Sequence, residues 1–217
     1  MPVLRSVNVG LSQEASWAGI GRTSIDKRPV SGPVEVDEHG PAGDQVSDLR
    51  HHGGVDQAVY AYAREDLDRW AERLGTGIED GQFGENLTTV GIDVNASEIG
   101  ERWAIGTVEL EVTSVRTPCN DFRVWMALTG HDNTAWVKRF TAEGRPGPYL
   151  RVTRSGVLAA GDEITVVHRP GHGITAAVMF RALTTEPALL PDLLALDALG
   201  EKARRRVERR LRRVVRS

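Results

Sequence analysis

The stretch VELEVTSVRTPCN, residues 108–120, decides the fold more than any other part of the chain. Apolar and polar residues alternate along residues 108–115, and this period of two is typical of a β-strand with one buried face. An Arg-Thr-Pro turn follows, and Cys119 comes directly before residues 121–127, which are predicted as a helix. The sequence therefore predicts a strand that delivers the cysteine to the beginning of a helix.

Other short apolar runs are separated by Gly and Pro, mostly within the first 170 residues. Strands are predicted in these runs, at residues 3–9, 34–36, 58–63, 149–153 and 163–167. Many short strands with closely spaced turns favour a barrel or a sandwich.

Helices are predicted in two parts of the chain. Within the body they cover residues 64–74, 121–127 and 133–140, where apolar residues recur at helical spacing. After Pro170-Gly171 the sequence becomes rich in Ala, Leu and Arg, and three helices are predicted at residues 175–183, 187–196 and 199–215. The predicted fold class is α+β, mainly β: a barrel-like domain over residues 1–168 with interspersed helices, and a small three-helix domain over residues 171–217.

The charge of the chain is unevenly distributed. The formal net charge is −3, yet residues 201–216 hold eight Arg and one Lys against two Glu. The N-terminus has no apolar signal core, and no apolar run approaches the roughly 18 residues that span a bilayer. We therefore expect a cytoplasmic protein without membrane contact. Its single cysteine cannot form an internal disulfide or supply a multi-thiolate metal site.

The first candidate site is the polar turn formed by Arg50, His51, His52, Gly53 and Gly54. Paired glycines let backbone amides approach a ligand, and the adjacent positive charge suits an anion such as phosphate. A metal site with Asp56 is disfavoured, because adjacent histidines on an extended chain point to opposite faces. A turn whose side chains only cap the local backbone remains open.

The second candidate site is the glycine-flanked segment 81–89. Asn86 and Thr88 can hydrogen-bond a flat heterocycle, and Glu85 can act as an acid, a base or an ion-pair partner. Such residues in turns are also common for structural reasons alone.

Cys119 is the third candidate. Its thiolate would be favoured by Arg116 and by the beginning of the predicted helix, as in reactive or metal-binding cysteines. A lone cysteine that is simply a small buried apolar residue is the alternative.

These segments, in this order, resemble the MOSC domain, and most closely its YiiM-like branch with a C-terminal three-α domain. The resemblance covers essentially the whole chain. It is carried by the following residues: Lys27-Arg28-Pro29-Val30 with Gly32, Gly43-Asp44-Gln45, Asp48, residues 50–54, residues 83–89, Ile99-Gly100 and Pro118-Cys119.

The resemblance implies a molybdenum cofactor, in which a molybdopterin and the thiolate of Cys119 bind molybdenum. The segments that contain His51, His52, Gly53 and Gly54, and those that contain Glu85, Asn86 and Thr88, match the cofactor-side loops of the family. Lys27 and Arg50 are the candidates for the terminal phosphate of the pterin. The mitochondrial relatives carry an Arg-Pro-Asn version of the second segment, where this chain has Gly84-Glu85-Asn86.

The implied activity is reduction of N-hydroxylated compounds, such as hydroxylamines, amidoximes and N-hydroxylated base analogues. The chain has neither a ferredoxin-type cysteine set nor a nucleotide-binding glycine fingerprint, so its electrons would come from a separate protein, a flavin reductase or a small redox carrier.

Two other functions remain open at this point. Cys119 could carry a persulfide in a sulfur-carrier or cofactor-handling protein. The Arg-rich helix at residues 199–215 could bind nucleic acid or an acidic redox partner, or it could simply dock by its apolar stripe. The acidic body of the chain and the absence of aromatic residues from this helix make nucleic acid the least favoured partner.

Overall fold

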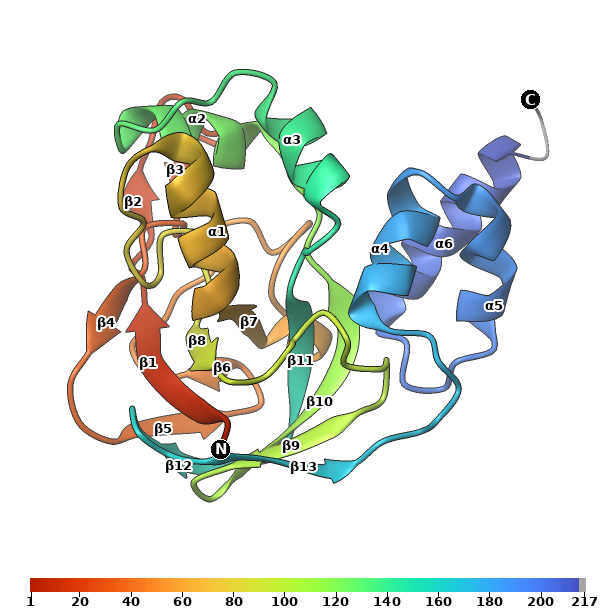
Figure 1. Ribbon diagram of the computed structural model, residues 1–217, viewed down its shortest axis with the longest axis horizontal. Helices are drawn as coiled ribbons and strands as arrows, with labels where there is room; N and C mark the ends of the chain where they lie inside the picture. Colours follow the sequence, from red (N-terminus) through yellow and green to blue (C-terminus); the bar gives the residue numbers. More distant parts are fainter. Residues whose placement is uncertain (215–217) are drawn as a thin grey trace.

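The computed structural model describes residues 1–214 and is built around an eight-stranded sheet (Figure 1). The strand order is β13-β9-β10-β11-β7-β8-β1-β4. Their bounds are, in chain order, β1 (Val3–Val9), β4 (Arg28–Val30), β7 (Val59–Ala63), β8 (Leu87–Val90), β9 (Arg102–Ile105), β10 (Val108–Val115), β11 (Pro148–Arg154) and β13 (Ile164–His168).

Neighbouring strands of this sheet run antiparallel except β7 and β8, which are parallel. Helix α1 (Arg64–Leu74) lies between them in sequence and makes the crossover that a parallel pair requires. The strand order does not close on itself, but an isolated bridge between Val3 and Glu163 brings β1 beside the start of β13. The predicted α+β, mainly β class and its barrel-like body are confirmed.

Two small sheets complete the body. Strands β12 (Gly156–Leu158), β5 (Val34–Asp37) and β6 (Gly40–Pro41) form one, and β2 (Gln13–Glu14) and β3 (Arg22–Thr23) form the other. Strand β10 is the longest strand of the described chain, and it covers the same residues that the alternating pattern predicts.

Helices α1, α2 (Asn120–Leu128) and α3 (Trp136–Glu143) lie together at one end of the sheet (Figure 1). Buried aromatic rings pack between them, with ring centroids 4.7 Å apart for Trp70 and Trp136 and 5.0 Å apart for Phe83 and Phe122. Burial of each such side chain contributes about 1.5–3 kcal/mol. This cluster fixes the helix that follows Cys119.

The C-terminal helices are α4 (Ala176–Thr184), α5 (Leu190–Leu194) and α6 (Glu201–Val214), and Figure 1 shows them grouped beside the sheet. The predicted apolar stripe of the last helix is buried at Leu199, Ala203 and Val207. Its last predicted member, Val215, lies outside the described residues. The division into domains at residues 168 and 171 stays a prediction.

Two helices have bounds in the structure that differ from the predicted ones. Helix α3 begins at Trp136 rather than at residue 133, because Ala135 has φ 50° and such a left-handed residue cannot belong to the helix. The helix predicted at residues 187–196 is a 3-10 turn, Pro187–Leu189, followed by the short α5. In residues 1–214 there is no helix that combines the length and the apolar character needed to cross a bilayer.

Gly81 offers a test of how tightly the turn before β8 is packed. It has φ 86°, and an added Cβ would collide with the backbone carbonyl of Lys27. Gly75 has φ 67°, but an added Cβ there would have no atom within 4 Å. We expect Gly81→Ala to lower the free energy of unfolding by about 2–4 kcal/mol and Gly75→Ala by about 1 kcal/mol. Urea denaturation measures both, and equal losses would contradict the tight packing at Gly81.

Candidate functional site

Two hollows of the molecule meet at Cys119. One is a cavity of about 110 Å³, whose lining comes from residues 22–149. The other is a groove of about 770 Å³ between the body and the C-terminal helices. Five residues line both: Asp48, His52, Gln57, Cys119 and Asp121. A ligand in either hollow can therefore reach the cysteine.

Cys119 is the N-cap of α2, as predicted. Its Sγ accepts a hydrogen bond from the backbone N–H of Phe122 at 3.4 Å, and the side chain is partly exposed. Amides at a helix N-terminus stabilise negative charge, so this position suits a thiolate.

Arg116 lies in the cavity and has only 6% of its surface exposed. Its guanidinium lies 5.2 Å from the Tyr60 ring centroid and 4.9 Å from that of Phe122. Nη1 donates to the Tyr149 hydroxyl at 3.5 Å, and Nε has no partner. No carboxylate of the described residues pairs with Arg116. A buried cation without a counter-charge is costly, and an anionic ligand would relieve that cost.

His52 is linked to this arginine through Tyr149. The His52 Nδ1 and the Tyr149 hydroxyl are 3.2 Å apart. Burial, and next the charge of Arg116, lower the pKa of His52 to about 4. Since Tyr149 accepts from Arg116, its own proton is free to bind the neutral imidazole at Nδ1.

The rest of the 50–54 turn divides between the two hollows. Arg50 and His51 line the groove, and Gly53 lines the cavity. The His51 Nδ1 lies 2.8 Å from Asp48 Oδ2. Gly54 lines neither hollow and caps the 3-10 turn Val55–Gln57. The structure thus brings most of the first predicted cluster to Cys119.

Helix α6 holds this turn in place. Lys202 Nζ donates to three carbonyl oxygens, those of Leu49 at 2.7 Å, His52 at 2.8 Å and Gly53 at 3.0 Å. The N–H of Glu201 donates to Asp56 Oδ2 at 2.7 Å. The C-terminal helices therefore fix the backbone on which His52 sits.

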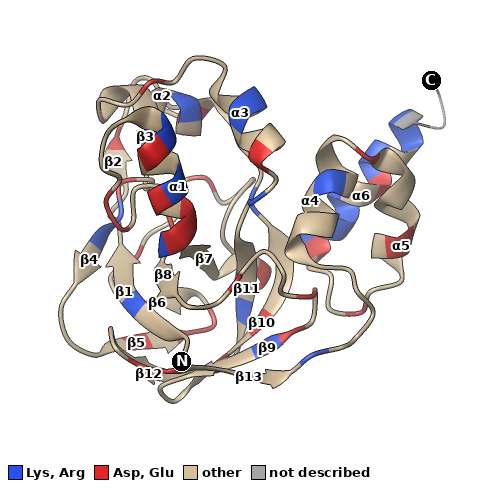
Figure 2. Ribbon diagram, viewed as in Figure 1, with Lys and Arg blue, Asp and Glu red and all other residues tan. Residues whose placement is uncertain are grey.

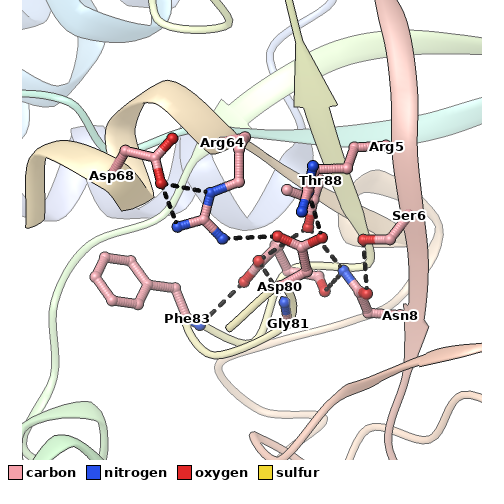
Figure 3. Close-up of polar contacts among 10 residues, drawn as sticks. Arg5, Ser6, Asn8, Arg64, Asp68, Asp80, Gly81, Phe83 and Thr88 are labelled. Atoms are coloured by element: carbon pink, nitrogen blue, oxygen red, sulfur yellow. Dashed lines mark hydrogen bonds and ion pairs between the residues drawn. The ribbon is translucent and has the colours of Figure 1, made fainter. Parts of the chain in front are cut away.

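In the second predicted cluster, Glu85 and Thr88 turn inward, away from both hollows. The Glu85 carboxylate accepts from Gly81 N–H at 2.6 Å, Phe83 N–H at 3.0 Å and Thr88 Oγ1 at 3.1 Å. Figure 3 shows Gly81, Phe83 and Thr88 gathered at this turn. Burial raises the pKa of Glu85 to about 7. These side chains shape the turn from within.

Asn86 and Lys27 do line the cavity, but their polar groups are already bonded. Asn86 Nδ2 donates to Asp44 Oδ2 at 2.9 Å, and its Oδ1 accepts from Tyr60 N–H at 3.1 Å. Lys27 forms a buried ion pair with Asp44, and burial lowers the pKa of Lys27. The Lys27 charge is thus largely cancelled.

Some of the buried polar atoms that lack a hydrogen-bond partner lie at the two hollows. Three buried atoms without a partner in residues 1–214 belong to side chains that line the hollows: Arg116 Nε, Gln57 Oε1 and Ser114 Oγ. Native proteins pair the large majority of such groups. Together with the Cys119 thiol, they fit a polar, anionic group that binds a soft metal.

A family model described as the MOSC domain matches residues 48–165, more than half of the chain. The chain belongs to the MOSC domain family.

Individual relatives agree with this assignment. The uncharacterized protein YflK of Bacillus subtilis (strain 168) is 29% identical over 171 residues, which are 78% of this chain and 75% of YflK. The solved structure of YiiM from Geobacillus stearothermophilus superposes with a TM-score of 0.80 at 26% identity and covers 97% of this chain and 100% of that one. A protein named Reductase from Gibberella moniliformis is 30% identical over 175 residues, 77% of this chain but 30% of the fungal protein.

The predicted site residues of this MOSC protein did not include several others that line the cavity, among them Asp44, Gln57, Arg116 and Tyr149. Asp44, Gln57 and Arg116 lie in or next to the motifs quoted from the sequence, so their proximity to a motif could have identified them. Tyr149 is recognisable only from the fold, because the pairing of β11 with β7 sets it opposite Tyr60.

The lowered pKa of His52 predicts a pH-dependent stability. Between its ordinary pKa of 6.5 and about 4, the unfolded chain binds more protons at this residue than the folded one. The stabilisation is complete above pH 6.5 and is lost as the pH falls toward 4. It amounts to about 2 kcal/mol when the exposure of the side chain is allowed for.

Chemical denaturation between pH 7 and pH 4.5 measures this loss, with His52→Gln as the test variant and the exposed His39→Gln as the control. The pH dependence should be weaker in His52→Gln and unchanged in His39→Gln. A His52 imidazole that titrates near pH 6.5 by NMR would contradict the assignment.

Proposed function

We propose that this MOSC protein is a molybdenum-cofactor-dependent reductase of N-hydroxylated compounds, fed with electrons by a separate protein. The observation that carries the proposal is the junction of two hollows at Cys119, beside the buried and uncompensated charge of Arg116. Membership of the MOSC family and the name of the fungal relative, Reductase, support an oxidoreductase.

The residues that would hold the cofactor lie where the cavity and the groove join, because the cavity of about 110 Å³ is by itself smaller than the roughly 300–1,000 Å³ of small-molecule pockets. Cys119 Sγ is the one thiol of the chain and would bind molybdenum. Arg116 and Gln57 would hydrogen-bond the pterin through atoms that have no partner in the described chain. When bound, the cofactor supplies the two-electron exchange with the substrate.

In the proposed reaction the N–O bond breaks: R–NHOH, two electrons and two protons give R–NH2 and water. The groove admits the substrate to Cys119, and His52, which lines both hollows, holds the hydroxyl proton of Tyr149 in the cavity. Because the His52 imidazole is neutral at pH 7, its Nδ1 accepts the Tyr149 hydroxyl proton and orients that hydroxyl.

Electrons would enter from a flavin reductase or another redox carrier. The one cysteine of this chain cannot hold an iron–sulfur cluster. In the fungal protein named Reductase, the matched segment is 30% of the length, so that protein contains a large amount of sequence outside the match.

Removal of the thiol tests the proposal. The protein is expressed with molybdate in a host that makes the cofactor, and molybdenum and released pterin are measured per chain. We expect near-stoichiometric amounts of both in the wild type and at least a fivefold loss of molybdenum in Cys119→Ala, because a soft ligand is removed. Cys119→Ser, with a hard oxygen donor of similar size, should lose nearly as much.

The loaded protein should then reduce a hydroxylamine when a flavin reductase and NADH are added. Molybdenum content that is equal in all three proteins would contradict the role of Cys119. No metal, together with a mass increase of one sulfur atom on Cys119, would support a persulfide carrier instead.

Arg116 offers a second test, because its two expected effects have opposite signs. In the unloaded protein, Arg116→Met should leave the free energy of unfolding within about 1 kcal/mol of the wild type or raise it, since an unpaired buried charge is removed. In the loaded protein the same change should lower the pterin content several-fold.

Arg123→Met is the matched control. Arg123 lies on α2, donates to Asn120 Oδ1 at 3.0 and 3.1 Å and lines neither hollow. Its substitution should not alter pterin content. Unchanged pterin in Arg116→Met would show that Arg116 has no part in holding the cofactor.

A further inference from the structure

Helix α6 presents one face to the groove that ends at Cys119. Five of its residues line the groove, Ala203 and four basic residues, and the spacing of the basic ones places them on one side of the helix: Lys202, Arg205, Arg206 and Arg209. Figure 2 shows basic residues along α6. Arg206 reaches the segment that carries the cysteine, since its Nη1 donates to Thr117 Oγ1 at 2.7 Å.

The groove is locally positive in a chain that is acidic overall. Its lining holds five Lys and Arg side chains, those four and Arg50, against two carboxylates, Asp48 and Asp121. The formal net charge of the whole chain is −3. Positive charge is therefore concentrated in the groove that Cys119 also lines.

Several basic residues of α6 have structural partners. Arg204 donates to the carbonyls of Leu194 and Leu196, and Arg210 donates to that of Thr184. These bonds tie the three C-terminal helices together. Lys202 is likewise engaged with the 50–54 turn.

The groove-facing arginines have fewer such ties. Arg205 pairs with Glu201 at 2.5 Å, and Arg209 has no hydrogen bond or ion pair within residues 1–214. Burial, and then the charges of Arg210 and Arg209, lower the pKa of Arg206. Like charges gathered without enough counter-charge favour the binding of an anion.

We propose that this groove binds the phosphate monoester of an N-hydroxylated nucleotide, with Arg205, Arg206 and Arg209 on the phosphate and the base toward Cys119. The inference rests on the proposed function, and it specifies the substrate class. A phosphate monoester carries a charge of about −1.5 to −2 at pH 7, which is opposite in sign to the positive surplus of the groove and offsets part of it. Guanidinium groups bind phosphate oxygens in pairs, which fixes orientation as well as affinity.

The size of the groove agrees with this ligand. Pockets that hold small molecules measure about 300–1,000 Å³, and this one measures about 770 Å³. Met179 and Leu183 of α4 give it an apolar wall on which a base or sugar can lie. The terminal phosphate of the pterin is a second source of the same chemistry, and the experiment separates the two.

The first arm uses protein made without cofactor and isothermal titration with 5′-AMP and adenosine. We expect the wild type to bind AMP at least tenfold more tightly than adenosine. The double variant Arg205→Gln/Arg209→Gln should lose at least tenfold of the AMP affinity. Arg213→Gln is the control, because Arg213 is an exposed basic residue of the same helix that does not line the groove.

AMP and adenosine bound with equal affinity would overturn the proposal. An equal loss in Arg213→Gln would also overturn it, because the binding would then follow net charge alone. This arm requires no activity, so AMP selectivity in a protein that never takes up molybdenum would reject the reductase function and retain the phosphate site.

The second arm uses loaded enzyme and compares kcat/KM for an N-hydroxylated adenosine and for its 5′-monophosphate. The ratio of nucleotide to nucleoside should fall at least tenfold in the double variant, with molybdenum and pterin contents unchanged. Loss of pterin from the double variant would assign the arginines to the cofactor phosphate, and the substrate proposal would be wrong.

Discussion

The buried side-chain amide of Asn86 joins three parts of the chain that are distant in sequence. Its Oδ1 accepts from Tyr60 N–H on β7, and its Nδ2 donates to Asp44 and, at 3.3 Å, to the carbonyl of Asn8 on β1. An unsatisfied buried amide would cost about 1–3 kcal/mol, so these distances define one arrangement of β1, β7 and the Asp44 loop. The parallel pairing of β7 with β8 begins at the next residue, Leu87.

The hydrogen bond between Asn86 and Asp44 also affects which cation of the cavity has a counter-charge. Asp44 is held by Asn86 and Gly10 and cancels the charge of Lys27, so that pair contributes little net field. Arg116 has no such carboxylate and is a buried cation without an ion pair in residues 1–214, whereas Arg22, which also lines the cavity, is exposed to solvent. The two buried cations, Lys27 and Arg116, are therefore not equivalent, although their formal charges are the same. A ligand that brings negative charge to the cavity gains most at Arg116.

The sequence predicts those elements whose signal is local. The alternation at residues 108–115 and the amphipathic spacing at residues 64–74 give β10 and α1 with their observed bounds. Strand β9, of 4 residues, was not predicted, because such a short segment becomes a strand through its partners. The direction of side chains in turns is also not local. Glu85 is a residue type that often binds ligands, yet two backbone donors of its own turn and the Thr88 hydroxyl of β8 hold its carboxylate inside.

The two hollows are lined by different parts of the chain, so substrate selectivity can change in the groove while the cavity stays the same. The cavity is lined by residues up to Tyr149, whereas the groove adds side chains of α4 and α6, beyond residues 48–165 that match the MOSC family model. Substitutions on the groove-facing side of α6 can change what approaches Cys119 without touching the cavity. The helix is not free to move, however, since Lys202 and the N–H of Glu201 bind it to the turn of His52. Helix α6 thus lines the groove with side chains that can vary, and through Glu201 and Lys202 it also fixes the backbone of the turn that carries His52.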